Sequence, residues 1–68
     1  MMKTLDLHGK RHYEVDRLVE NFILLNEPPL SIITGKSEFM LARVENSCKK
    51  HKIKYEKFVP GKVTILKW

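Results

Sequence analysis

Leu5-Asp6-Leu7-His8-Gly9 alternates apolar and polar residues and then reaches a glycine. This pattern is typical of a short, half-buried strand that ends in a turn. We expect Leu5 and Leu7 to face the core, because alternate side chains of a strand lie on the same face. Asp6 and His8 are then expected to share the open face of the sheet.

An amphipathic helix is predicted to follow this strand, from His12 to Leu25. Its apolar residues recur at helical spacing and form one stripe. The stripe consists of Val15, Leu18, Val19, Phe22 and Leu25. Pro28-Pro29 ends the helical segment, because proline has no N–H for a helical hydrogen bond and restricts the residue before it.

A strand, a second helix and a hairpin are predicted in the second half of the chain. Their expected ranges are 30–34 for the strand, 38–50 for the helix, and 53–58 and 62–66 for the hairpin. The core side chains expected from this helix are Met40, Leu41, Val44 and Cys48. Ser37 is the expected N-cap of the helix, and Pro60-Gly61 predicts the turn of the hairpin.

The element order is βαβαββ, which predicts an α/β protein built as a two-layer α+β sandwich. A crossover between parallel strands is almost always right-handed, so both helices are expected on one face of the sheet. We expect one domain, 1–68, because 68 residues bury only a marginal core. This length excludes an enzyme with separate cofactor and substrate domains, and 43% apolar residues exclude a disordered chain.

Cys48 is the single cysteine, so the chain forms no internal disulfide, and a reducing, cytoplasmic location is expected. No apolar run approaches the roughly 20 residues of a membrane span. The N-terminus also lacks the apolar stretch of a signal peptide. We therefore expect no membrane contact, and a monomer or a weak homodimer.

The chain is basic, with a formal net charge of +5, which indicates an anionic partner such as nucleic acid. Residues 1–35 hold four basic and five acidic side chains, a net charge of −1. Residues 36–68 hold nine basic and three acidic ones, a net charge of +6. A solvated helix end is the alternative explanation for the lysine run at 49–54.

Polar and basic residues follow two of the predicted strands at the point where each strand ends. Asp6 and His8 are followed by Lys10 and Arg11, and the second strand runs into Thr34-Gly35-Lys36-Ser37. Ligands of open α/β sheets gather beyond the carboxyl ends of parallel strands. Free N–H groups at a helix start also favour phosphate. We therefore predict a site for a phosphodiester at this edge of the sheet.

Each of these residue types has a chemical role in such a site. His8 can act as a general acid or base, because an imidazole exchanges protons near neutral pH. Asp6 can orient the imidazole or hold a metal. Lys36 opposes the helix dipole unless an anion neutralises it, and Lys10 and Arg11 can bind backbone phosphates. The alternative is that all of them are solvated surface groups.

The two motifs together resemble those of the Smr (small MutS-related) domain family. Leu5-Asp6-Leu7-His8 is similar to the family's LDxH motif, and Thr34-Gly35-Lys36 is similar to the start of its T/H-G-x-G motif. They stand in the family's order and at about its separation, and the resemblance covers essentially the whole chain, as a short stand-alone form. Ser37 and Phe39 stand where the family usually has glycine, which permits close approach of the backbone. The two alternatives are a narrower phosphate pocket and a serine hydroxyl that replaces an amide contact, and the departure weighs against catalysis more than against binding.

The resemblance implies a translation initiation factor C-terminal-domain-like fold with a mixed four-stranded sheet. It implies a domain that binds RNA or structured DNA and, in several members, nicks DNA or cleaves RNA as an endonuclease. By position, Asp6 and His8 would be the catalytic pair. The residues expected at the bound phosphates are Lys10, Arg11, Thr34, Gly35, Lys36 and Ser37. Participation of a divalent metal, Mg²⁺ or Mn²⁺, is left open. The alternatives are a non-catalytic nucleic-acid-binding module and a small protein-interaction domain that uses the open sheet face.

Three other patterns predict no further site. Gly35-Lys36-Ser37 lacks the first glycine of a phosphate-binding loop, since position 30 is Leu30. Cys48 and His51 have metal-ligand spacing but no partner pair, so a core thiol and a solvated helix end are expected. Tyr55, Phe58 and Trp68 can stack on bases, but such aromatics more often cover a small core, and only Tyr55 and Trp68 are kept as stacking candidates.

Overall fold

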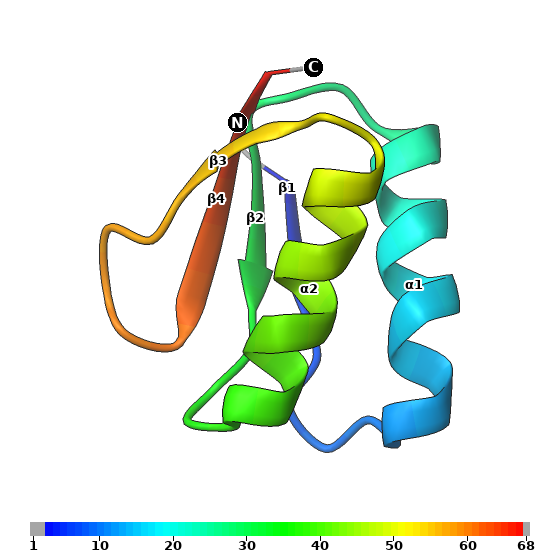
Figure 1. The fold of residues 1–68 in the computed structure, drawn as a ribbon, viewed down its shortest axis with the longest axis vertical. Helices are drawn as coiled ribbons and strands as arrows, with labels where there is room; N and C mark the ends of the chain where they lie inside the picture. The colour runs from blue at the N-terminus through cyan, green and yellow to red at the C-terminus, as the bar shows by residue number, and fades with distance from the viewer. Residues whose placement is uncertain (1–2, 68) are drawn as a thin grey trace.

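The structure, a computed structural model, describes residues 3–67 of the chain (Figure 1). Its elements follow one another in the predicted βαβαββ order. They are β1 Lys3–Asp6, α1 His12–Leu25, β2 Leu30–Ile33, α2 Glu38–Lys50, β3 Lys54–Glu56 and β4 Lys62–Lys67. Neither helix in this part of the chain has the length and apolar composition that a membrane crossing requires. Trp68 lies outside the described residues.

The four strands form one mixed sheet in the order β1-β2-β4-β3. β1 pairs parallel with β2, whereas β4 pairs antiparallel with both β2 and β3. β1, β2 and β3 therefore run in one direction, and β4 returns between the last two. Both helices cover the same face of this sheet (Figure 1), as the crossover rule predicts. The protein is thus α+β, with a helical layer on a four-stranded mixed sheet.

One cluster of buried apolar side chains fills the space between the helices and the sheet. The sheet side supplies Leu7, Leu30, Ile32, Val63 and Ile65, and the helices supply Val15, Val19, Ile23, Met40, Val44 and Cys48. Leu18, Phe22 and Leu41 are partly buried against it. The prediction for Leu25 is wrong, because its side chain is 80% exposed. Leu25 lies six residues after Val19, about 120° round the helix from it, and Ile23 takes the inward position.

The strand bounds differ from the predicted ones: β2 and β3 are shorter, and β4 extends one residue further, to Lys67. β1 ends at Asp6, although the buried Leu7 still donates its N–H to Ile33 O at 2.9 Å. His8 therefore lies in the following loop, and the prediction that it shares the open sheet face with Asp6 is wrong. Ile53 is not part of β3, because its N–H donates to Cys48 O at 2.8 Å and closes the end of α2.

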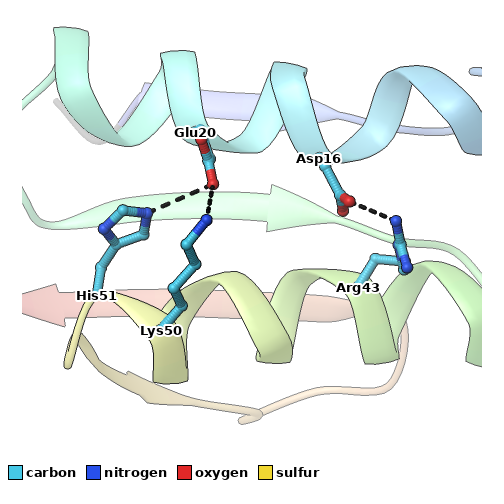
Figure 2. Close-up of polar contacts among 5 residues, drawn as sticks. All are labelled: Asp16, Glu20, Arg43, Lys50 and His51. Carbon is cyan, nitrogen blue, oxygen red and sulfur yellow. Dashed lines mark hydrogen bonds and ion pairs between the residues drawn. The ribbon is translucent and has the colours of Figure 1, made fainter.

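Ion pairs join the two helices along their outer sides (Figure 2). Arg43 pairs with Asp16, and Glu20 accepts from Lys50 at 3.3 Å and lies 3.5 Å from His51 Nε2. The acidic side chains of α1 thus face basic side chains of α2. Part of the positive charge in the second half of the sequence is therefore used within the fold rather than offered to a partner.

Candidate functional site

Three loops meet at one edge of the sheet, at the lower edge in Figure 1. They are the loop 7–11 after β1, the loop 34–37 after β2, and the loop 57–61 that leads into β4. The first two were predicted to form a site because they follow parallel strands. The third reaches the same edge because β4 runs antiparallel to β2.

The first loop is a tight turn held by a carboxylate. Asp6 Oδ1 accepts a hydrogen bond from the backbone N–H of His8 at 2.8 Å, and Lys10 N donates to Leu7 O at 3.0 Å. Gly9 has a φ of +80°, a conformation that glycine adopts without steric cost. Asp6 therefore orients His8 through its backbone, and within residues 3–67 no hydrogen bond joins the carboxylate to the imidazole.

The second loop is held mainly by its own backbone. The side chain of Thr34 is buried, and its hydroxyl donates to Gly35 O at 3.2 Å. The N–H groups of Thr34 and Gly35 both donate to Gly61 O, at 2.8 and 3.1 Å. These two amides hold the third loop and are not free to bind a phosphate, so Thr34 and Gly35 position the site rather than supply its donors.

Gly61 is a site residue that the sequence pattern predicted only as part of a hairpin turn. A Cβ atom added there would lie 3.1 Å from Gly35 O and 3.3 Å from its carbonyl carbon, and φ is +79°. Both restrictions favour glycine at this position. The signal was present in Pro60-Gly61, but the partner of that turn lies more than twenty residues away and depends on the pairing of β2 with β4.

The start of α2 follows directly and is capped as predicted. Ser37 Oγ accepts from Met40 N at 3.2 Å, and Ser37 O accepts from Leu41 N at 3.1 Å. The N–H groups of residues 36–39 have no hydrogen-bond acceptor among the described residues. Four backbone donors thus remain open at the positive end of the helix dipole.

The first and second motifs meet at His8 and Gly35. A Cβ atom added to Gly35 would lie 3.9 Å from His8 Nδ1. The imidazole therefore lies directly beside the loop that begins α2, although the two residues are distant in the sequence. This proximity places a proton-exchanging side chain and a set of free backbone donors at a single edge.

An open groove of about 500 Å³ lies between the start of α2 and the third loop. Its lining residues are Ile33, Gly35, Lys36, Ser37, Glu38, Leu41, Pro60 and Gly61. Ile33, Leu41 and Pro60 make much of this surface apolar, while Lys36 provides a cation at its border. Phe58, just before Pro60, is 67% exposed.

Basic side chains surround the same loops. Lys10, Arg11 and Lys36 are exposed, and none of them forms an ion pair with another described residue. The backbone N–H of Arg11 donates to Glu14 Oε2 at 3.1 Å at the start of α1, which leaves its guanidinium free. These cations differ from Arg43 and Lys50, which pair with acidic residues of α1.

The other predicted positions lie elsewhere. Tyr55 is half-buried, and its hydroxyl donates to Glu45 Oε2 at 3.0 Å, so it links β3 to α2 and is not available for stacking. Burial, followed by this hydrogen bond, raises the pKa of Tyr55. Cys48 is fully buried, and burial raises the pKa of its thiol to about 11, as expected for an inert core cysteine.

Among the described residues, the acidic and histidine side chains do not form a cluster of metal ligands. Within residues 3–67, no three histidine, cysteine, aspartate or glutamate side chains are grouped closely enough to hold a metal ion. One oxygen of Asp6 is already engaged by the His8 N–H.

Comparison of the chain with protein-family models, curated proteins and solved structures finds no match. The resemblance to the Smr family therefore stays a prediction that rests on the two motifs. Any function has to be argued from the residues at this edge.

Proposed function

We propose that this chain is an Smr-like nucleic-acid-binding domain, with the translation initiation factor C-terminal-domain-like fold that the family has. RNA or structured DNA would lie along the edge formed by the loops 7–11 and 34–37. The observation that supports this most directly is the position of the His8 imidazole beside Gly35, which brings the two motifs together. We further propose a cytoplasmic monomer or weak homodimer.

A phosphate would bind at the start of α2. The open N–H groups of residues 36–39 provide hydrogen-bond donors, and the exposed Lys36 adds a full positive charge. Phosphates are favoured at such a helix end because the donors and the dipole both attract anions. Neighbouring phosphates of the same strand would contact Lys10 and Arg11 beside His8.

In the catalytic form of the proposal, His8 moves a proton during RNA cleavage. The ribose 2′-oxygen attacks the adjacent phosphorus while the imidazole takes the hydroxyl proton, and the bond from phosphorus to the 5′-oxygen breaks. The leaving 5′-oxygen receives that proton, which gives a 2′,3′-cyclic phosphate and a 5′-hydroxyl. Lys36 and the amides after Gly35 would stabilise the charge on the phosphoryl oxygens. In this reaction the bonds and protons balance without a metal ion.

A non-catalytic binding module is the second candidate, and one observation favours it. The Asp6 carboxylate bonds the His8 backbone N–H rather than the imidazole, so it does not fix the tautomer of a general base. Ser37 and Phe39 also replace the glycines that the family uses near the phosphate. The first of these features affects proton transfer and not binding, so together they weigh against catalysis more than against binding.

A nuclease assay separates the two candidates. Labelled RNA and DNA are incubated with wild type, His8→Ala, Asp6→Ala and His51→Ala, with Mg²⁺ and with a chelator. The catalytic form predicts that RNA cleavage is lost in His8→Ala, reduced in Asp6→Ala, and kept in His51→Ala, whose histidine lies at the opposite end of α2. Equal cleavage by all four proteins would mean contamination and rule out the catalytic form. If wild type bound nucleic acid without cleaving it, the non-catalytic binding module would be the remaining candidate.

A further inference from the structure

The groove beside Lys36 has more apolar surface than phosphate binding requires. Its volume of about 500 Å³ lies within the roughly 300–1,000 Å³ that small-molecule sites occupy. Leu41 and Pro60 lie on its walls, and both glycines of the Gly35–Gly61 contact line it. A sugar–phosphate backbone gains little from such walls, whereas a flat, mostly apolar group would bury surface against them.

An exposed aromatic ring belongs to the same loop. Phe58 is 67% exposed and Val59 is 50% exposed, directly before the Pro60 that lines the groove. A large apolar side chain left in solvent on a protein this small has no evident packing role. Aromatic rings in this position are typical platforms for nucleobases, which stack on them independently of sequence.

The other exposed aromatic side chains have contacts that explain them or lie apart from the groove. The Phe39 ring stacks on His12 with centroids 4.0 Å apart, and Arg43 lies 5.6 Å above its centroid. Tyr13 is 78% exposed but lies on α1, which supplies no lining residue, whereas Phe58 lies two residues before Pro60 in a loop that supplies two. Phe58 is therefore the ring whose position and exposure fit a stacking role beside Lys36.

We propose that this groove takes an unpaired nucleobase of single-stranded RNA, stacked on Phe58, while Lys36 binds the phosphate next to it. The inference rests on the proposed nucleic-acid function and adds the class of substrate. A duplex cannot supply such a base, because its bases are stacked and paired inside the helix. RNA is the source we assign, because recognition of RNA is directed mainly at single-stranded loops, bulges and ends, with bases stacked on aromatic side chains.

Fluorescence anisotropy with labelled oligonucleotides tests the inference. The probes are a single-stranded RNA, a single-stranded DNA of the same sequence, and the RNA annealed to its complement. The proteins are wild type, Phe58→Ala, Phe58→Trp and Leu25→Ala. Leu25 is a matched control, because it is 80% exposed and ends α1 at the opposite end of the molecule. Circular dichroism checks that each variant is folded.

The single-stranded RNA is expected to bind wild type most tightly. Phe58→Ala should weaken that binding by about 5- to 150-fold, the loss of one stacked base. Phe58→Trp should restore it, and Leu25→Ala should leave it unchanged.

Three results would overturn the inference. If Phe58→Ala bound the single-stranded RNA as tightly as wild type does, Phe58 would have no stacking role. If wild type bound the duplex as tightly as the single strand, the bound base would not need to be unpaired. Equal affinity for the single-stranded DNA would overturn the assignment to RNA. Each of these leaves nucleic-acid binding itself in place, whereas failure of wild type to bind any of the probes would overturn the proposed function as well.

Discussion

Replacement of Gly61 by alanine tests the contact that holds the second and third loops together. Gly61 has a φ of +79°, and a Cβ atom would lie 3.1 Å from Gly35 O. Gly9 provides a matched control, since its φ is +80° but a Cβ atom there would meet nothing within 4 Å. Alanine at either position incurs the left-handed backbone cost of about 1–2 kcal/mol. Only Gly61→Ala also pushes the backbone of the third loop away from Gly35.

The additional cost follows from the hydrogen bonds at this contact. Gly61 O accepts from Thr34 N at 2.8 Å and from Gly35 N at 3.1 Å, and weakening two such bonds costs about 1–3 kcal/mol in total. We expect Gly61→Ala to lower the free energy of unfolding by that amount more than Gly9→Ala does. For a chain of this size the difference is a large part of a total near 3–10 kcal/mol.

Urea denaturation followed by circular dichroism measures both variants on the same scale. The difference should also lower Tm by roughly 4–8 °C for each kcal/mol. Equal unfolding free energies for Gly61→Ala and Gly9→Ala would refute the reasoning, because the close approach to Gly35 would then have no energetic effect.

Three further variants test the cap, the helix pair and the phosphate contact. Ser37→Ala should cost about 1 kcal/mol in urea denaturation through loss of the bond to the first turn of α2, while Ser37→Gly should cost only a few tenths. The hydrogen bond and charge of Lys50, followed by His51, lower the pKa of Glu20. The stability from this pair is therefore present above about pH 4.5 and lost as pH falls below it, and Lys50→Ala should remove this part of the pH dependence of Tm. Lys36→Ala should weaken nucleic-acid binding and reduce its salt dependence by about one phosphate contact, and Lys49→Ala, at the other end of α2, should change the salt dependence less.

The sequence was sufficient for the features that local chemistry determines. The bounds of α1 and α2 were predicted correctly, because the apolar spacing, the Ser37 cap and Pro28-Pro29 all act within a few residues. The same local reasoning misplaced Leu25, since a stripe defined by spacing alone does not show which side chains the sheet covers. Ile23 occupies the buried position instead.

The end of β1 and the position of the third loop depended on contacts that the residue pattern does not show. β1 stops at Asp6 because the Asp6 carboxylate turns the chain at His8, which the alternating pattern does not reveal. The pairing of β2 with β4 brings Gly61 to Gly35, and the third loop thereby supplies Pro60 and Gly61 to the groove. The candidate site was therefore predicted in its first two loops and missed in its third.

The most direct test of the central claim is an NMR titration of the ¹⁵N-labelled protein with a short single-stranded RNA. The claim is that the edge formed by the loops 7–11, 34–37 and 57–61 binds nucleic acid. It predicts that the amide signals of these loops shift together, while those of residues 24–27 at the opposite end do not. Shifts confined to the face of the sheet away from the helices, at Thr4, Ser31 and Thr64, or the absence of shifts at any RNA concentration, would contradict it.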